Sequence, residues 1–155
     1  MSNKIPCKIT LELNSTAYTG QDVQDVLPHF MTDYTTFVGL TWVPSAFGTE
    51  AFFISITIGA AIGVAQGFLS ELGTDLYKWT KEKLLLLLKK KSAPEGQLII
   101  SWQDITVTIY IEKTDDILDI LSKFNIIEAK ALKSLPKKEV DLFPNDIKEL
   151  FEDNE

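Results

Sequence analysis

The chain has 155 residues, of which 45% are hydrophobic, 10% aromatic and 24% charged, values that are typical of one globular domain. The net charge is -7 and all 15 basic residues are lysine. Because arginine supplies the planar fork that contacts guanine and phosphate, an acidic chain without arginine predicts no nucleic-acid partner.

The N-terminal residues indicate the compartment. Residues 1–6 are polar with a single lysine, and the apolar stretch of a secretory signal does not follow them. The chain has one cysteine, Cys7, which cannot form an internal disulfide and fits a reducing environment. We therefore expect a cytoplasmic protein without a secretory signal.

The first third of the chain predicts two strands and a helix. Residues 7–13 alternate apolar and polar side chains, which is the period of a half-buried strand. Residues 19–31 carry acidic residues near their start and predict a helix that Pro28 ends or bends. Residues 35–44 are β-branched and aromatic, so they predict a second strand.

The middle of the chain predicts a strand followed by a long amphipathic helix. Residues 51–58 have period two, and from there the apolar side chains recur with helical spacing over residues 60–90. Gly59, Gly63 and Gly67 lie four residues apart and would share one small-residue face of that helix. Such a face predicts close packing of the helix against a sheet, another helix or a second subunit.

The same stretch leaves a membrane alternative open. Residues 51–72 contain no lysine or arginine, and in this alternative they insert while the lysines of residues 78–91 lie at the lipid surface. A spanning helix, however, is apolar around most of its circumference for about 20 residues. Because Gln66, Glu71 and Asp75 interrupt this pattern, membrane contact is the disfavoured interpretation.

Five consecutive leucines, residues 84–88, point to every side of the predicted helix. A second surface must therefore cover them. We expect either a homodimer or a lid formed by the C-terminal helices, with Leu84, Leu86 and Leu87 as packing residues.

The last third predicts a hairpin and three short helices. Residues 97–102 and 105–112 flank a turn and alternate as strands do. Residues 114–124 predict a helix capped by Thr114, and residues 126–135 a further short helix.

The C-terminal residues 141–155 predict an acidic helix capped by Asn145, outside a domain of residues 1–140. From Glu139 onward, seven acidic residues accompany one lysine. Four apolar side chains are the candidate anchors for a protein partner: Phe143, Ile147, Leu150 and Phe151. The alternative is that this helix caps the core of its own domain.

The sequence holds no recognisable catalytic or metal constellation. One histidine and one cysteine exclude a His-rich or Cys-based metal site within the chain, and neither common glycine-rich phosphate loop occurs. Asp22, Asp25 and His29 could share a helix face, which is most often simply solvated. The acidic residues within 115–119 suit a helix N-terminus without a metal. We predict no catalytic residue, no metal and no cofactor.

Two segments, AFFISITIGAAIGVAQGFLSEL and SWQDITVTIYIEKTDDILDIL, carry a resemblance over residues 51–123. An apolar helix with a basic end, an alternating hairpin and an acidic-capped helix resemble the effector-associated constant components of bacterial conflict systems. The resemblance implies a non-catalytic module that works beside an effector enzyme or NTPase.

The expected fold is α+β, with a mixed or mainly antiparallel sheet of about five strands covered by one long helix and shorter C-terminal helices. The expected function is a non-enzymatic interaction or regulatory accessory module in a bacterial cytoplasm, with a protein partner or a homo-oligomer. Two alternatives remain, a membrane-active protein that inserts residues 51–72 and an unrecognised hydrolase.

Overall fold

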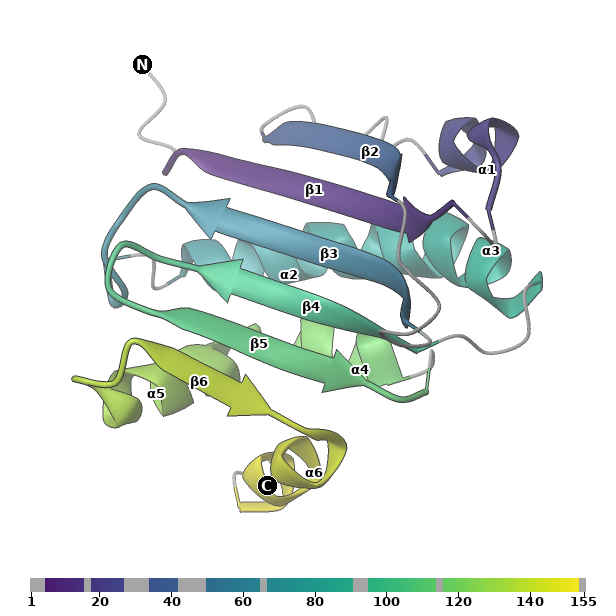
Figure 1. Ribbon diagram of the computed structural model, residues 1–155. Helices are drawn as coiled ribbons and strands as arrows, with labels where there is room; N and C mark the ends of the chain where they lie inside the picture. The colour runs from purple at the N-terminus through teal and green to yellow at the C-terminus, as the bar shows by residue number, and fades with distance from the viewer. Residues whose placement is uncertain are drawn as a thin grey trace.

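The computed structural model describes residues 5–15, 18–26, 34–41, 50–64, 67–90, 95–113 and 116–153. Within these ranges the protein is α+β, as the sequence predicts, with one six-stranded sheet (Figure 1). The strands are β1 (Cys7–Asn14), β2 (Thr35–Thr41), β3 (Glu50–Ile58), β4 (Glu95–Ser101), β5 (Thr106–Ile111) and β6 (Glu139–Leu142). The helices are α1 (Gly20–Asp25), α2 (Phe68–Trp79), α3 (Leu85–Lys90), α4 (Asp116–Ser122), α5 (Phe124–Ser134) and α6 (Pro144–Asp153), and one π-helical turn, η2 (Thr80–Leu84), joins α2 to α3.

The sheet is mixed, with the strand order β2-β1-β3-β4-β5-β6. Its pairs alternate: β1 is parallel to β2 and antiparallel to β3, β3 is parallel to β4, β4 is antiparallel to β5, and β5 is parallel to β6. The sequence predicts about five strands and misses β6, because its four residues are at the lower limit of the length over which alternation indicates a strand.

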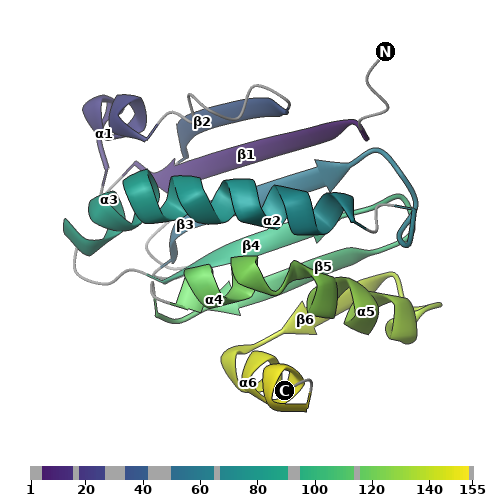
Figure 2. The same cartoon turned by 180° about the vertical axis from the view of Figure 1, so that it is seen from behind.

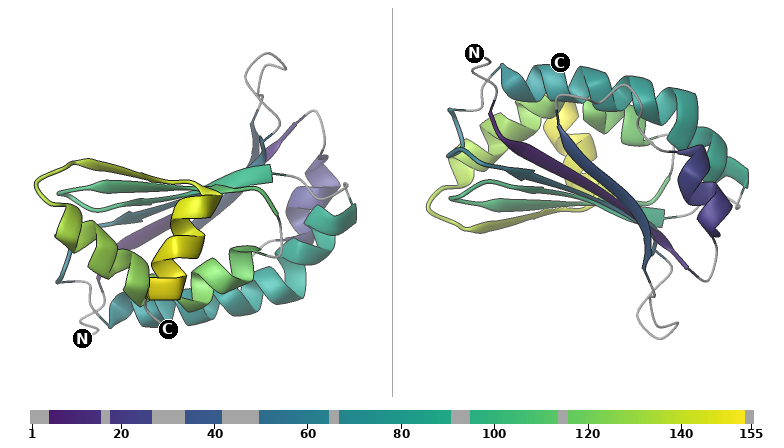
Figure 3. Two further views of the ribbon diagram at one scale, coloured as in Figure 1. Left: turned by 90° about the horizontal axis from the view of Figure 1, so that it is seen from below. Right: turned by 90° about the horizontal axis from the view of Figure 1, so that it is seen from above.

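The helices α2 to α6 lie on one face of the sheet (Figures 2 and 3). Alternate strand residues are buried beneath them, which confirms the period-two pattern of the strands. The buried residues of the four central strands include Cys7, Ile9, Leu11, Leu13, Phe52, Ile54, Ile56, Ile58, Leu98, Ile100, Val107, Ile109 and Ile111. Each such side chain stabilises the fold by about 1.5–3 kcal/mol, and the layer packs against the buried side chains of the helices to form the hydrophobic core.

The long helix differs from its prediction at the N-terminal end. It begins at Phe68, not at residue 60, because Gly63 and Gly67 adopt φ angles of 91° and 86°. These angles belong to the left-handed region, where glycine is tolerated and a right-handed helix cannot continue. Gly59 ends β3 and donates its N–H to the Pro6 carbonyl at 2.8 Å. The prediction that the three glycines line one helix face is therefore wrong.

Residues 51–72 do not form a single helix. Their described part comprises β3, a turn and the first residues of α2. In the part of the chain that the structure describes, no helix combines the length and the apolarity needed to cross a membrane.

Two buried or half-buried hydrogen bonds attach the N-terminal segments to the helix layer. The Trp79 indole N–H donates to the Val26 carbonyl at 2.7 Å, which fixes the end of α1. The Tyr34 hydroxyl donates to Asp75 at 2.7 Å, and its ring lies edge-on to Phe68 with centroids 6.0 Å apart. The start of β2 is thus anchored to α2.

Candidate interaction surface

Helix α6 carries three of the four side chains predicted to bind a partner. Pro144 occupies its first position, where the missing N–H costs nothing, and Asp146 accepts the N–H of Phe143 at 2.9 Å. The helix therefore begins at Pro144, and the predicted cap at Asn145 is wrong by two positions. Asp146, which accepts the Phe143 N–H, lies inside the first turn of the helix.

The four predicted anchors do not share one outward face. Ile147 and Phe151 are buried in this chain's own core, and Leu150 is half-buried. Phe143 is 51% exposed and stacks on Tyr110, with ring centroids 4.5 Å apart and the planes 3° from parallel. Helix α6 thus caps the core with one side, and only Leu150 and Phe143 face outward in part.

A groove of about 470 Å³ lies between α5, β6 and α6, and Leu150 contributes to its lining. We call it the acidic groove. Its charged residues are Glu139, Asp141, Asp146, Glu149 and Asp153, with Lys130 and Lys137 on the α5 side. Five carboxylates against two lysines leave three negative charges in excess around the Leu150 side chain.

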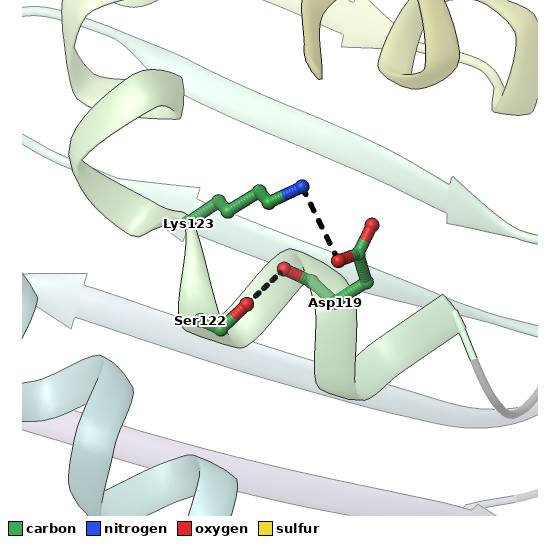
Figure 4. Close-up of polar contacts among 3 residues, drawn as sticks. All are labelled: Asp119, Ser122 and Lys123. Carbon is green, nitrogen blue, oxygen red and sulfur yellow. Dashed lines mark hydrogen bonds and ion pairs between the residues drawn. The ribbon is translucent and has the colours of Figure 1, made fainter. Parts of the chain in front are cut away.

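A second groove, of about 410 Å³, lies between α4, α6 and the end of β5. Its charges nearly balance: Glu112, Asp116, Asp119 and Glu152 against Lys113, Lys123 and Lys148. The Lys123 ammonium lies 3.4 Å from Asp119 and 4.6 Å from the centre of the Phe151 ring. Figure 4 shows this ion pair beside the Ser122 hydroxyl, which donates to the Asp119 carbonyl at 2.8 Å. The charges of this second groove therefore nearly cancel, whereas those of the acidic groove do not.

Among the described residues, no helix covers the other face of the sheet (Figure 3). Strand register places small polar residues across much of it, for example Thr10 beside Ser55. Phe37 of β2, which lies beside Thr10, is 58% exposed on this face. Three half-buried large side chains, Phe53, Ile99 and Tyr110, lie on the same face in the inner strands. The face therefore mixes small polar residues with large apolar and aromatic side chains.

The leucine run is mostly covered within one chain. Leu84 and Leu87 are buried, as are the neighbouring Leu85 and Leu88, whereas Leu86 is 63% exposed. Of the three predicted packing leucines, two belong to this chain's own core and one points to solvent.

Two buried ionisable groups belong to no predicted site. Burial raises the pKa of the Cys7 thiol to about 12, so this cysteine stays protonated and unreactive at neutral pH. Glu128 of α5 is only 4% exposed, and its Oε2 has no hydrogen-bond partner among the described residues. Burial raises the pKa of Glu128, and the only sequence signal for it is a position on the apolar side of α5.

The candidate polar clusters of the sequence have structural roles where they are described. Asp22 forms a capping box with Thr19, whose N–H it accepts at 2.7 Å, and Asp25 accepts from the Gln21 side chain at 3.1 Å. His29 and Asp115 lie outside the described residues, as does Thr114. Among the residues described, no group of three or more His, Cys, Asp or Glu could hold a metal ion.

Comparison of the chain with protein-family models, with curated proteins and with solved structures gives no match in any of the three.

Proposed function

We propose that this protein is a non-enzymatic interaction module, a regulatory accessory component in a bacterial cytoplasm, and that a partner protein docks in the acidic groove. The observation that carries the proposal is the excess of three carboxylates around the half-buried Leu150. Its placement beside an effector in a conflict system rests on the resemblance of residues 51–123.

The chemistry of the groove specifies the partner. Surplus carboxylates attract a basic segment over a range of about 8 Å at physiological salt, and Leu150 offers an apolar contact once the segment is seated. A short amphipathic segment with lysine or arginine flanking an apolar side chain satisfies both features. Binding through such a surface should weaken as salt rises.

The test uses a synthetic amphipathic lysine–leucine peptide titrated into isotopically labelled protein. The test variant combines Glu139→Gln, Glu149→Gln and Asp153→Asn, which leaves the structural Asp146 in place. In NMR spectra of the unmodified protein, we expect the largest changes in backbone amide chemical shift in α5, β6 and α6. Three exposed charge contacts at about 0.5 kcal/mol each predict roughly tenfold weaker binding by the variant.

The matched control combines Glu12→Gln, Glu71→Gln and Glu82→Gln, three acids of β1, α2 and η2 that do not line the groove. It removes the same net charge and should change affinity by less than about twofold. Equal weakening by both triple variants would show that only the overall charge matters. Shifts centred on another surface would also contradict the proposal.

A further inference from the structure

The two edge strands of the sheet, β2 and β6, differ in length and charge, and the proposed function does not involve β2. Strand β6 is four residues long and exposes the charged side chains of Glu139 and Asp141. Strand β2 has seven residues, Thr-Thr-Phe-Val-Gly-Leu-Thr, without a charge or a proline. Short length, charge and proline are the devices that keep an edge strand from pairing with another chain, and β2 has none of them.

Strand β2 also exposes apolar side chains on both faces of the sheet. Phe37 is 58% exposed on the face without helices, and Leu40 is 44% exposed on the helix face beside Leu13. Solvent exposure of the face without helices would account for Phe37 but not for Leu40, which lies on the opposite face. An edge that exposes apolar groups on both sides is typical of a surface that another strand covers.

Contacts with β1 and α2 fix the position and register of strand β2. It is in parallel register with β1 from Lys8↔Thr35 to Asn14↔Thr41, and Tyr34 fixes its start through Asp75. No strand among the described residues pairs with its outer side, so the N–H and C=O groups of that side can accept a new strand. Figure 3, seen from above, shows β2 along the sheet edge, with α1 in contact with the strand beside one end.

The sequence of β2 matches a second copy of itself. In an antiparallel pair centred on Val38, Phe37 lies opposite Gly39 of the second copy, and Thr36 lies opposite Leu40. Gly39 has no side chain, and the Phe37 ring of its own strand lies over it, since a Cβ there would lie 2.6 Å from that ring. In the pair the two Phe37 rings therefore meet on the face without helices, Leu40 faces the smaller Thr36 on the other face, and no like charges meet.

The charge distribution is compatible with the same arrangement. The acidic groove lies at β6, five strand spacings or about 24 Å from β2, which is well beyond the Debye length at physiological salt. Two copies of net charge -7 can therefore approach through the edges most distant from their acidic ends.

We propose that two copies of this chain pair through β2, antiparallel about a two-fold axis at Val38, to form one continuous sheet across the dimer. The dimer places the two acidic grooves at opposite ends and leaves both open. The proposal is independent of what binds in either groove.

The first test is the solution mass by light scattering at several concentrations. We expect the unmodified protein at twice the chain mass of 17.4 kDa, and Phe37→Lys and Leu40→Lys variants at the monomer mass with unchanged circular dichroism. Leu86→Lys is the matched control, because it places the same charge on another exposed leucine, in α3. It should remain dimeric.

A second measurement does not depend on weakening the edge. Residues opposite each other in an antiparallel pair have Cα atoms about 4.5–5.5 Å apart, within disulfide range. A Thr36→Cys/Leu40→Cys variant should therefore form an intermolecular disulfide, whereas Thr36→Cys alone should remain unlinked. A monomeric unmodified protein, a dimer broken only by Leu86→Lys, or equal cross-linking of the two cysteine variants would each overturn the proposal.

Discussion

Glu128 places an ionisable carboxyl group in the buried interior of the protein. Its side chain is buried on α5, and one carboxylate oxygen has no partner among the described residues. Burial raises the pKa of this carboxyl above its value in the unfolded chain. The folded protein therefore binds an extra proton between the two pKa values, and its free energy of unfolding falls as pH rises through that window.

Replacing Glu128 by glutamine should stabilise the protein at neutral pH, because the amide removes a buried charge while keeping the shape. The expected gain is about 1 kcal/mol, or roughly 2–4 °C in melting temperature for a chain of this size. The gain should disappear below about pH 4, where the glutamate is protonated in both states.

Thermal unfolding followed by circular dichroism across this pH range checks the prediction. Glu82→Gln, at an exposed site of η2, is the control and should leave the melting temperature unchanged at every pH. A Glu128→Gln variant that is less stable at neutral pH would mean that the carboxylate makes a stabilising contact.

At the scale of elements, α3 separates leucines that are adjacent in sequence. Leu87 is buried and Leu86 is 63% exposed, because successive residues of a helix are about 100° apart around its axis. The helix needs cover on one side only, and the chain supplies it. The exposed leucine is left for solvent or for a partner.

Truncation of the two leucines should therefore have unequal effects. Leu87→Ala should lower the free energy of unfolding by about 2–5 kcal/mol through lost burial and a cavity. Leu86→Ala should change it by less than about 0.5 kcal/mol. Urea denaturation of both variants measures the difference, and similar losses would indicate that Leu86 is covered by a second molecule.

Helix α6 shows a second consequence at this scale. Because it buries Ile147 and Phe151 while presenting Leu150 and its acids to the acidic groove, deleting it would remove core and groove together. Point substitutions of exposed acids are therefore the informative test of docking, whereas a chain ending at residue 140 would lose stability under either interpretation.

At the scale of the molecule, order should decrease from the centre of the sheet toward β6. Strands β3 and β4 have strand neighbours on both sides and fully buried side chains, whereas β6 is a four-residue edge. Amides that open only with global unfolding belong to such central strands.

Hydrogen exchange should accordingly be slowest in β3 and β4 and at least about tenfold faster in β6. Mass spectrometry of exchanged peptides measures the order, with β5 as the internal reference between them. Exchange in β6 as slow as in β3 would contradict this gradient and imply that β6 is covered by another chain.

The sequence by itself determined the elements in which a periodic pattern extends over several residues. Alternation in β1, β3 and β5 predicted both the strands and the residues they bury, since a period of two over several residues is characteristic of a strand with one buried face. It also predicted the α+β class and the acidic C-terminal helix. The α2–η2–α3 helix was predicted except for its start.

Only the tertiary structure decided the rest, because the deciding interactions join residues distant in sequence. Gly63 and Gly67 fit a helix face by spacing alone, but their left-handed φ angles place them before the helix. Strand β6 exists because β5 provides its partner, and its four residues are at the lower limit of the length over which alternation indicates a strand. The side of α6 that faces the core, and the isolation of β2 at an edge, follow from strand order, which local patterns do not encode.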